Sequence, residues 1–385
     1  MKKISALICA IICVSLILCS CEPQEITSNT ANYGTLGVYY EYYGLSDSSR
    51  AVTSFRNMVN YFFSVGAYDE GWDYENSRVV GDFVIGDYTD SETNDSVCIL
   101  TYTGESKDVV IPEQLDGKNV VALGAYNISY DECVRLPFKG VGFRSISLPS
   151  TLKYIYAGAL EFDEEFFVSE QDKISKDFTL PESINVDPDN KYFSSENGVL
   201  YSKDKSCLLC VPMGYKADEF TVPASVQYIA SDAIVCENIK QLNIGKNVVG
   251  INYPSYIFGK KLESINVDEQ NEKYSSEDGV LFDKNKKILL SYPSMKKDKR
   301  YALPDTAEKV AANWGYVLKT EEIVFNEGIE ECQIYEQPYV YSDYNAEGVA
   351  WYSSIKKICG YRGSGFDEAV YNIRSLSDID FEYLN

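Results

Sequence analysis

Histidine is absent from all 385 residues of the chain. Without an imidazole the protein cannot build a Ser-His-Asp or Cys-His catalytic arrangement, a His-Glu-x-x-His zinc site or a histidine proton relay. The commonest nucleophilic and zinc-dependent enzyme classes are therefore excluded. No catalytic residue and no cofactor is expected.

Basic residues are also scarce, with 35 Lys and Arg against 58 Asp and Glu, which gives a formal net charge of −23. A surface this acidic repels phosphate backbones and anionic head groups, so no nucleic-acid partner is expected. Acidic runs such as residues 161–165 give a solvated face. They do not resemble the two facing carboxyl groups that glycoside hydrolysis requires.

The N-terminus has the pattern of an export signal. Lys2 and Lys3 precede an uncharged apolar run over residues 4–19, and the polar residues 22–24 follow Cys21. The run is short for a membrane-spanning helix, although an uncleaved anchor helix is the alternative. The ending Leu-Cys-Ser-Cys resembles the bacterial lipobox, in which the last cysteine is acylated and becomes the first residue. We expect a signal peptide over residues 1–20, lipid attachment at Cys21 and no other contact with the membrane.

One segment occurs twice, 81 residues apart. Residues 184–223 recur without a gap at 265–304, and eighteen of the forty positions are identical. Asn197-Gly198 and Asp278-Gly279 are strong signals for a two-residue type I′ hairpin turn. A second reversal follows in each copy before another apolar run. Each copy is therefore predicted to form a three-stranded antiparallel meander.

A shorter unit recurs along the remaining chain. It consists of a strand, usually a proline, a polar pair and a second short apolar stretch, and its copies begin near Val110, Ser147, Phe178, Phe220, Leu242, Tyr301 and Ile323. One such unit has a single apolar edge, which it cannot bury alone. Stacked neighbours complete the core, as in a solenoid.

These units resemble the BspA-like bacterial leucine-rich-repeat proteins. The resemblance rests on residues 220–236, on the Asn-Val-Asp…Asn…Ser-Ser…Gly-Val-Leu stretch of both long copies, on an opening module over 98–123 and on a closing module that begins at Gly360. It implies a curved leucine-rich-repeat solenoid over residues 79–385, horseshoe-like but β-dominated, with β-hairpin insertions. Residues 21–78 then form a tether and an N-terminal cap, with a short helix over 49–63.

Cysteine usage argues against both a disulfide framework and a metal site. Seven cysteines follow the signal, an odd and scattered set: Cys98, Cys133, Cys207, Cys210, Cys236, Cys332 and Cys359. The pair Cys207 and Cys210 has the spacing of a redox or zinc motif. The aligned positions of the second copy are Ile288 and Ser291, so we expect both cysteines to fill a strand. No metal is predicted; weak calcium binding near Asp187 remains open, with a β-turn the better account.

Strand alternation predicts a candidate binding surface. If Phe220, Leu242 and Ile265 point inward, the residues beside them point outward. The predicted outward set is Ser147, Thr179, Thr221, Asn243, Asn266, Ala302 and Val324. Nearly all are small, which favours a protein partner on a flat face.

Tyrosine is abundant, with 32 residues. One cluster contains Tyr335, Tyr339, Tyr341 and Tyr344. Tyrosine suits recognition surfaces but equally packs beneath loops. This cluster is the predicted site for any glycan.

The favoured function is that of a lipid-anchored, surface-exposed protein of the cell envelope, non-enzymatic, which adheres to or recognises a protein or glycan on another cell or matrix. That reading rests mainly on the family resemblance. A structural or accessory envelope protein without a dedicated ligand is the alternative. A secreted carbohydrate-active enzyme, or its accessory, is the third hypothesis.

The lipid anchor is directly testable. Cys21→Ala should abolish incorporation of labelled palmitate and move the protein to the soluble fraction, because two or more acyl chains supply the membrane affinity. Unchanged labelling of the variant would remove the lipobox interpretation.

Overall fold

The computed structural model describes residues 77–88, 95–127, 132–134, 143–155, 160, 180–230, 233–251, 257, 259, 261–311, 319–332, 354–367, 370 and 379–384. The chain divides into two compact units, Met1–Val65 and Gly66–Asn385, and every described residue belongs to the second. Cys21, the predicted signal peptide and the predicted helix over 49–63 lie outside the described residues. The domain boundaries at 20 and 78 therefore stay predictions.

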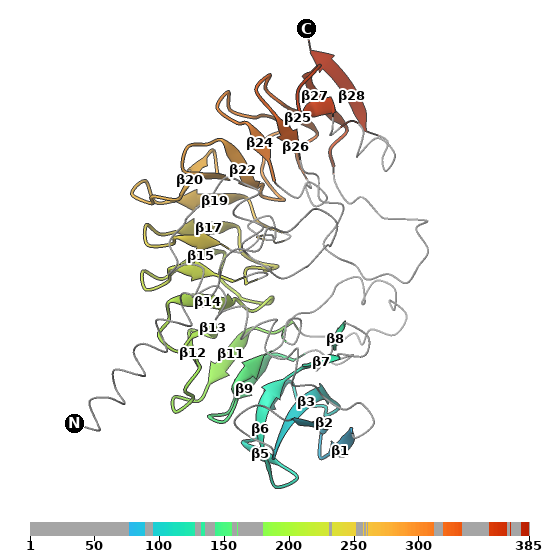
Figure 1. Cartoon of the computed structure of the whole chain (residues 1–385), viewed down its shortest axis with the longest axis vertical. Coiled ribbons are helices and arrows are strands. Elements are labelled where there is room, and N and C mark those ends of the chain that lie inside the picture. Colours follow the sequence, from blue (N-terminus) through green and yellow to red (C-terminus); the bar gives the residue numbers. More distant parts are fainter. Residues whose placement is uncertain are drawn as a thin grey trace, which may run out of the picture. The chain divides into compact units, whose positions relative to one another are not determined.

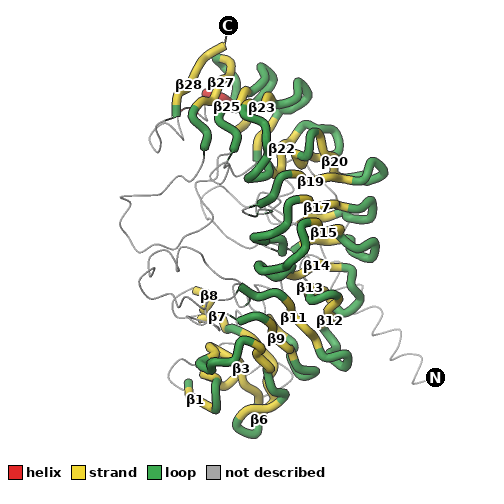
Figure 2. Tube along the Cα trace, turned by 180° about the vertical axis from the view of Figure 1, so that it is seen from behind, coloured by secondary structure: helices red, strands yellow, loops and turns green. Residues whose placement is uncertain are grey.

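Strands dominate the described part of the chain, as the sequence predicts (Figures 1 and 2). The helical residues within it are Phe366, Asp367 and Val370. No helix among the described residues has the length and apolar character needed to cross a membrane.

The first kind of sheet is a ladder of short parallel strands. One ladder consists of β4 (Asp108–Val110), β9 (Ser145–Leu148) and β11 (Ser183–Val186). A second consists of β15 (Glu219–Thr221), β17 (Gln241–Ile244) and β19 (Ser264–Val267). A third consists of β23 (Arg300–Ala302), β25 (Glu322–Val324), β27 (Lys357–Tyr361) and β28 (Asp380–Leu384). Neighbouring strands pair in register, so equivalent residues of successive repeats lie side by side.

The second kind of sheet begins with an antiparallel meander and continues with parallel strands. In the first repeated copy it comprises β12 (Phe193–Glu196), β13 (Val199–Ser202), β14 (Cys207–Cys210), β16 (Tyr228–Ile229) and β18 (Gly250–Ile251). In the second copy it comprises β20 (Tyr274–Glu277), β21 (Val280–Asp283), β22 (Ile288–Ser291), β24 (Lys309–Val310) and β26 (Glu331–Cys332). The predicted meander is confirmed in both copies.

A third sheet of this kind opens the described chain. The sequence predicts an opening module over residues 98–123 but does not identify it as a third copy of the pattern. It runs β1 (Arg78–Val80), β2 (Phe83–Tyr88), β3 (Ser96–Tyr102), β6 (Lys118–Leu123) and β10 (Tyr154–Ile155), with β5 (Gln114–Leu115) beside β6. A separate pair is formed by β7 (Ala125–Asn127) and β8 (Glu132–Val134).

An irregularity in the strand pairing shows that the three mixed sheets are equivalent. The register shifts between Val84 and Ile85 in β2, between Leu200 and Tyr201 in β13, and between Leu281 and Phe282 in β21. Each shift lies at the second and third residues of the middle strand of its meander. Such bulges bend a strand and increase its twist. The described chain thus contains three copies of one sheet pattern, of which the sequence identifies two.

The hairpin turns have the backbone that their sequences predict. Both central residues have positive φ, at 52° and 79° for Asn197-Gly198 and at 50° and 76° for Asp278-Gly279. Glycine is required at the second position for a further reason: a Cβ on Gly198 would lie 2.7 Å from the Cβ of Ser183. The carbonyl of Gly198 also accepts the N–H of Ile184, so the hairpin turn is hydrogen-bonded to the edge strand β11. Gly279 does the same for Ile265.

In each long copy, one buried asparagine ties the copy to the repeat before it. Asn190 donates from Nδ2 to the carbonyls of Pro149 and Leu152, and its Oδ1 accepts the N–H groups of Tyr192 and Phe193. Asn271 makes the same four kinds of bond in the second copy. Both are fully buried. Because a buried polar group is costly when it is unpaired, this complete pairing fixes the turn after β11 and β19.

The core combines the inward residues of the ladders with buried residues of the mixed sheets. Leu242, Ile265 and Ile323 are all 0% exposed, as the alternation predicts. Truncation of such a residue to alanine typically costs about 2–5 kcal/mol of unfolding free energy.

The equivalence of the two long copies predicts that one can be removed. Deletion of residues 184–264 joins Ser183 to Ile265, so that β19 takes the place of β11 and Gly279 meets Ser183 as Gly198 does now. We expect a shorter protein that unfolds cooperatively with a smaller urea m-value, measured by circular dichroism.

Deletion of residues 184–263 is the matched control. It leaves one extra residue, which shifts the strand by one position and turns its apolar side chains to the opposite face. If both deletion variants lose structure to the same extent, the two long copies are not structurally equivalent.

Candidate binding surface on the ladder strands

The outward side chains of the first two ladders form a continuous pattern that we call the strand face. Its residues are Asp108, Val110, Ser145, Ser147, Ser183 and Asn185 in the first ladder and Glu219, Thr221, Gln241, Asn243, Ser264 and Asn266 in the second. Within each ladder a residue lies opposite its equivalent in the neighbouring strand, for example Thr221 beside Asn243 and Asn243 beside Asn266. None of the twelve is aromatic and none is basic.

A hydrogen-bond network orders the second ladder's part of this face. Asn243 donates to Glu219 Oε1 at 2.6 Å and to Thr221 Oγ1 at 3.1 Å. Its Oδ1 accepts from Gln241 at 3.0 Å and from Asn266 at 3.1 Å. The amide of Asn243 is therefore fully used within the face, whereas Thr221 is exposed. A face with fixed side chains loses less conformational entropy when it binds.

Val324 does not belong on an exposed surface. Its predicted place in the ladder is right, between Ala302 and Cys359, but only 9% of it is exposed. Cys359 is 2% exposed, and its thiol donates to the Glu322 carboxylate at 3.5 Å. Arg300 pairs with Glu322 at 3.3 Å, so charged side chains occupy the outward positions next to Val324 on these strands. Strand alternation predicts the direction of a side chain but not its exposed fraction.

Ala302 is exposed on β23 of the third ladder, as predicted. The remaining predicted residues divide into two groups. Ser147, Thr221, Asn243 and Asn266 lie on the strand face, half-buried or exposed. Thr179, Tyr335, Tyr339, Tyr341 and Tyr344 lie outside the described residues. The prediction missed Asn185, which is exposed beside Ser147, and Val110, which is 66% exposed on the first strand of the ladder. The Asn185 position could have been found from the repeat, since it aligns with Asn266.

A column of charged residues runs beside the ladders, made by the residue that precedes a strand, and its charge alternates in sign within the second and third ladders. We call it the rim column; it contains Lys107, Arg144, Glu182, Asp218, Lys240, Glu263, Lys299, Glu321 and Lys356. Lys240 pairs with Asp218 at 2.7 Å, and Glu321 pairs with both Lys299 and Lys356. Glu182 and Glu263 are each paired with a later lysine, Lys216 and Lys297, at 2.7 Å.

Ion pairs within the rim column lower the pKa values of two of its acids, Glu321 and Asp218. The two lysines beside Glu321 lower the pKa of its carboxyl to about 2. The hydrogen bond from Lys240 likewise lowers the pKa of Asp218. Exposed ion pairs contribute little stability each, so we assign the column mainly to fixing which strand lies beside which. These downward shifts arise from ion pairs and do not prepare an acid for proton transfer at neutral pH.

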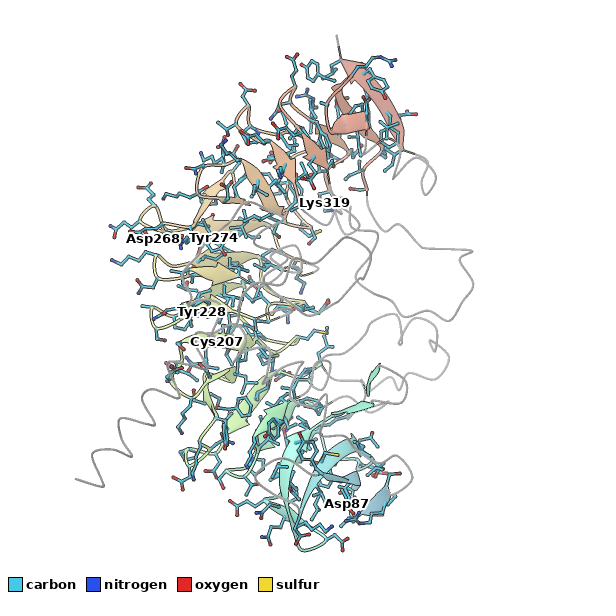
Figure 3. All side chains as sticks on the ribbon, in the orientation of Figure 1. Asp87, Cys207, Tyr228, Asp268, Tyr274 and Lys319 are labelled. Carbon is cyan, nitrogen blue, oxygen red and sulfur yellow. The ribbon has the colours of Figure 1, made fainter. Side chains whose placement is uncertain are left out.

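The cysteines behave as small core residues. Cys98 and Cys207 occupy the same position in equivalent strands, both are 0% exposed, and burial raises the pKa of the Cys98 thiol to about 12. Cys210 aligns with Thr101 and Ser291. Figure 3 places Cys207 beside Tyr228, its partner in β16. Since Ile288 replaces Cys207 in the second copy, a thiol is not needed at this position.

Asp187 and Asp268 form turns. The Oδ1 of each accepts the N–H of the residue two positions later, at 2.8 Å in both copies. No group of three potential metal ligands occurs among the described residues. The local hydrogen bonds account for these acids as turn residues.

Comparisons with known proteins identify neighbours of similar fold. No protein-family model and no curated protein sequence matches the chain. The solved structure of the pneumococcal vaccine antigen PcpA is similar at 17% identity, with a TM-score of 0.39, over 74% of this chain and 69% of that one. A leucine-rich repeat protein from Eubacterium ventriosum is similar at 16% identity, with a TM-score of 0.36, over 80% of this chain and 84% of that one.

A leucine-rich cell surface protein from Faecalibacterium prausnitzii is similar at 14% identity, with a TM-score of 0.34, over 80% of this chain and 95% of that one. The descriptions of the last two neighbours name leucine-rich proteins, the class that the sequence resembles. Because the identities and TM-scores are low, the case for function rests on this chain's own strands and side chains.

The rim column predicts how acid affects stability. The carboxyl pKa of Glu321 is lower in the folded chain than the ~4.3 of an unfolded one. Its stabilising effect is therefore complete above ~4.3 and is lost as the pH falls towards 2. Glu321→Gln should lower the midpoint of thermal unfolding at pH 7 and flatten its decline between pH ~4.5 and ~2.

Glu327→Gln is the control, since Glu327 is exposed and has no ion pair with the described residues. If both variants follow the wild-type acid profile, the rim column does not contribute to stability.

Proposed function

We propose that this chain is a leucine-rich-repeat solenoid, exported and lipid-anchored through Cys21, which recognises a protein at the cell surface without catalysing a reaction. The observation that carries the proposal is the strand face. It is regular, polar and ordered by its own hydrogen bonds, and the core behind it is fully buried. Such a face provides a rigid surface for a partner, which is the usual task of stacked-repeat proteins.

The chemistry of the face favours a protein partner. Its side chains are small and weakly charged, and ligand pockets for small molecules are instead concave and lined by aromatic residues. A glycan would be directed to the segment with Tyr335, Tyr339, Tyr341 and Tyr344, which offers aromatic side chains. The structural or accessory envelope role remains the second reading, and the carbohydrate-active enzyme the third.

The neighbours' descriptions are consistent with a surface location. One is a vaccine antigen and another a cell surface protein. The surface-exposed, lipid-anchored location is proposed from the export signal and from Cys21. Protease treatment of intact cells that cleaves the chain without lysis would support it, and complete protection would favour the structural role on an inner side of the envelope.

One substitution tests the strand face. Thr221→Arg places a long cationic side chain at an exposed position of this face. It should leave the free energy of unfolding within ~0.5 kcal/mol of wild type. It should weaken binding of the mature chain to an array of immobilised matrix proteins by about tenfold, because it holds the partner away from the face. Asn243 is unsuitable for this purpose, since its amide makes four hydrogen bonds.

The matched variant is Tyr339→Ala with Tyr341→Ala. It should leave protein binding unchanged and reduce any binding to a glycan array. If the wild-type chain binds neither array, the recognition role fails and the structural reading replaces it.

A further inference from the structure

The duplication offers a way to separate structural from functional residues. A residue kept in both long copies for the fold should make the same contact in both. Nearly every kept residue does so. Glu196 pairs with Lys205 as Glu277 pairs with Lys286, at 2.6 Å in each case. Such pairs explain why the residues recur.

Other kept residues have equally clear shared roles. Ser195 and Ser276 accept the N–H of Val186 and of Val267, at 2.9 Å in both copies. Lys203 donates to the carbonyl of Pro188, and Lys284 to that of Glu269. The kept apolar residues are buried in both copies: Ile184 and Ile265, Val199 and Val280, Leu200 and Leu281, Leu208 and Leu289, Leu209 and Leu290.

Asn185 and Asn266 are the exception. Both point outward on the strand face, Asn185 exposed and Asn266 half-buried. Asn266 donates to Asn243, its neighbour in β17. Asn185 lies beside Ser147 and makes no side-chain hydrogen bond with the described residues. The two asparagines thus share a position without sharing a contact.

Local structure does not explain why asparagine is kept there. Asparagine is depleted in β-strands, so strand propensity would favour its replacement. A ladder of stacked amides accounts for Asn266 and Asn243, but it does not account for Asn185. What the two positions have in common is an amide presented to the exterior, and this points to contact with something outside the chain.

The surroundings indicate what that contact is. An asparagine side chain offers one acceptor oxygen and an NH2 donor, which match the N–H and C=O of a peptide group. Ser183 and Ser147 flank Asn185, and Ser264 flanks Asn266, so small side chains leave room for a main chain to approach. The only charged residues of the strand face are Asp108 and Glu219, both acidic. Asp108 is paired with Arg144, whereas Glu219 has no ion pair with the described residues and accepts only the amide of Asn243.

We propose that Asn185 and Asn266 are two equivalent anchor points at which the strand face binds the extended main chain of a basic protein segment. Each amide bonds to a peptide group of the partner, and Glu219 attracts a lysine or arginine side chain of the partner. This assignment rests on the proposed recognition function and specifies its partner.

The test uses the full mature chain as immobilised bait and a displayed library of random twelve-residue linear peptides as the probe. Enriched peptides are synthesised and their Kd values measured against wild type, Asn185→Ala, Asn266→Ala and the double variant. Asn119→Ala is the matched control, an exposed asparagine on β6 away from the strand face. A glycan array is probed in parallel with the same proteins.

We expect enriched peptides rich in Lys and Arg. Their Kd should rise about tenfold in the double variant, less in each single variant and not at all in Asn119→Ala, as the loss of about two hydrogen bonds requires. Equal Kd values for wild type and the double variant would overturn the anchor assignment and leave recognition at another surface. Glycan binding that depends on the two asparagines would overturn the partner class. Absence of binding in both libraries would count against the proposed function itself.

Discussion

The structure depends on one constraint: each short strand has a single apolar edge that only the next repeat can cover. Leu242 is fully buried because β15 and β19 lie on either side of it, in register. A lone repeat would leave such a residue in water, at a cost of roughly 1.5–3 kcal/mol for each large apolar side chain. Stacking is therefore obligatory, and every other feature adjusts to keep neighbouring strands in register.

Three devices maintain that register, and each acts between residues far apart in sequence. Asn190 and Asn271 tie a turn to the preceding repeat through backbone carbonyls. The glycine turns bring a hairpin against β11 and β19, where any larger residue would collide with the serine of the strand. The rim column places opposite charges beside one another. The asparagines are buried and the glycine turns have close contacts, so both have strict geometry, whereas the rim column adds mainly selectivity among similar strands.

The same constraint shapes the candidate binding surface. Residues on the inner side of a strand must fit the core, so variation is confined to the outward positions. In the first two ladders these positions carry mostly polar residues, and in the third they include ion-paired side chains beside the buried Val324 and Cys359. The same strand pattern therefore gives two kinds of outward surface, one without ion-paired side chains over most of its length and one with them. The part with exposed amides is the part suited to hydrogen bonding with a partner.

The sequence by itself determined the duplicated copy, the hairpin turns, the meanders and the inward core positions, because these depend on local turn chemistry and on strand periodicity. The tertiary structure decided the rest. The sheet that begins at β1 resembles the other two in its pairing and bulge but not in its residues, so sequence comparison could not find it. The partners within the rim column, the burial of Val324 and the exposure of Asn185 depend on which residues, twenty to forty positions apart, lie one strand spacing (about 4.8 Å) from each other. Only the stacked repeats fix those neighbours.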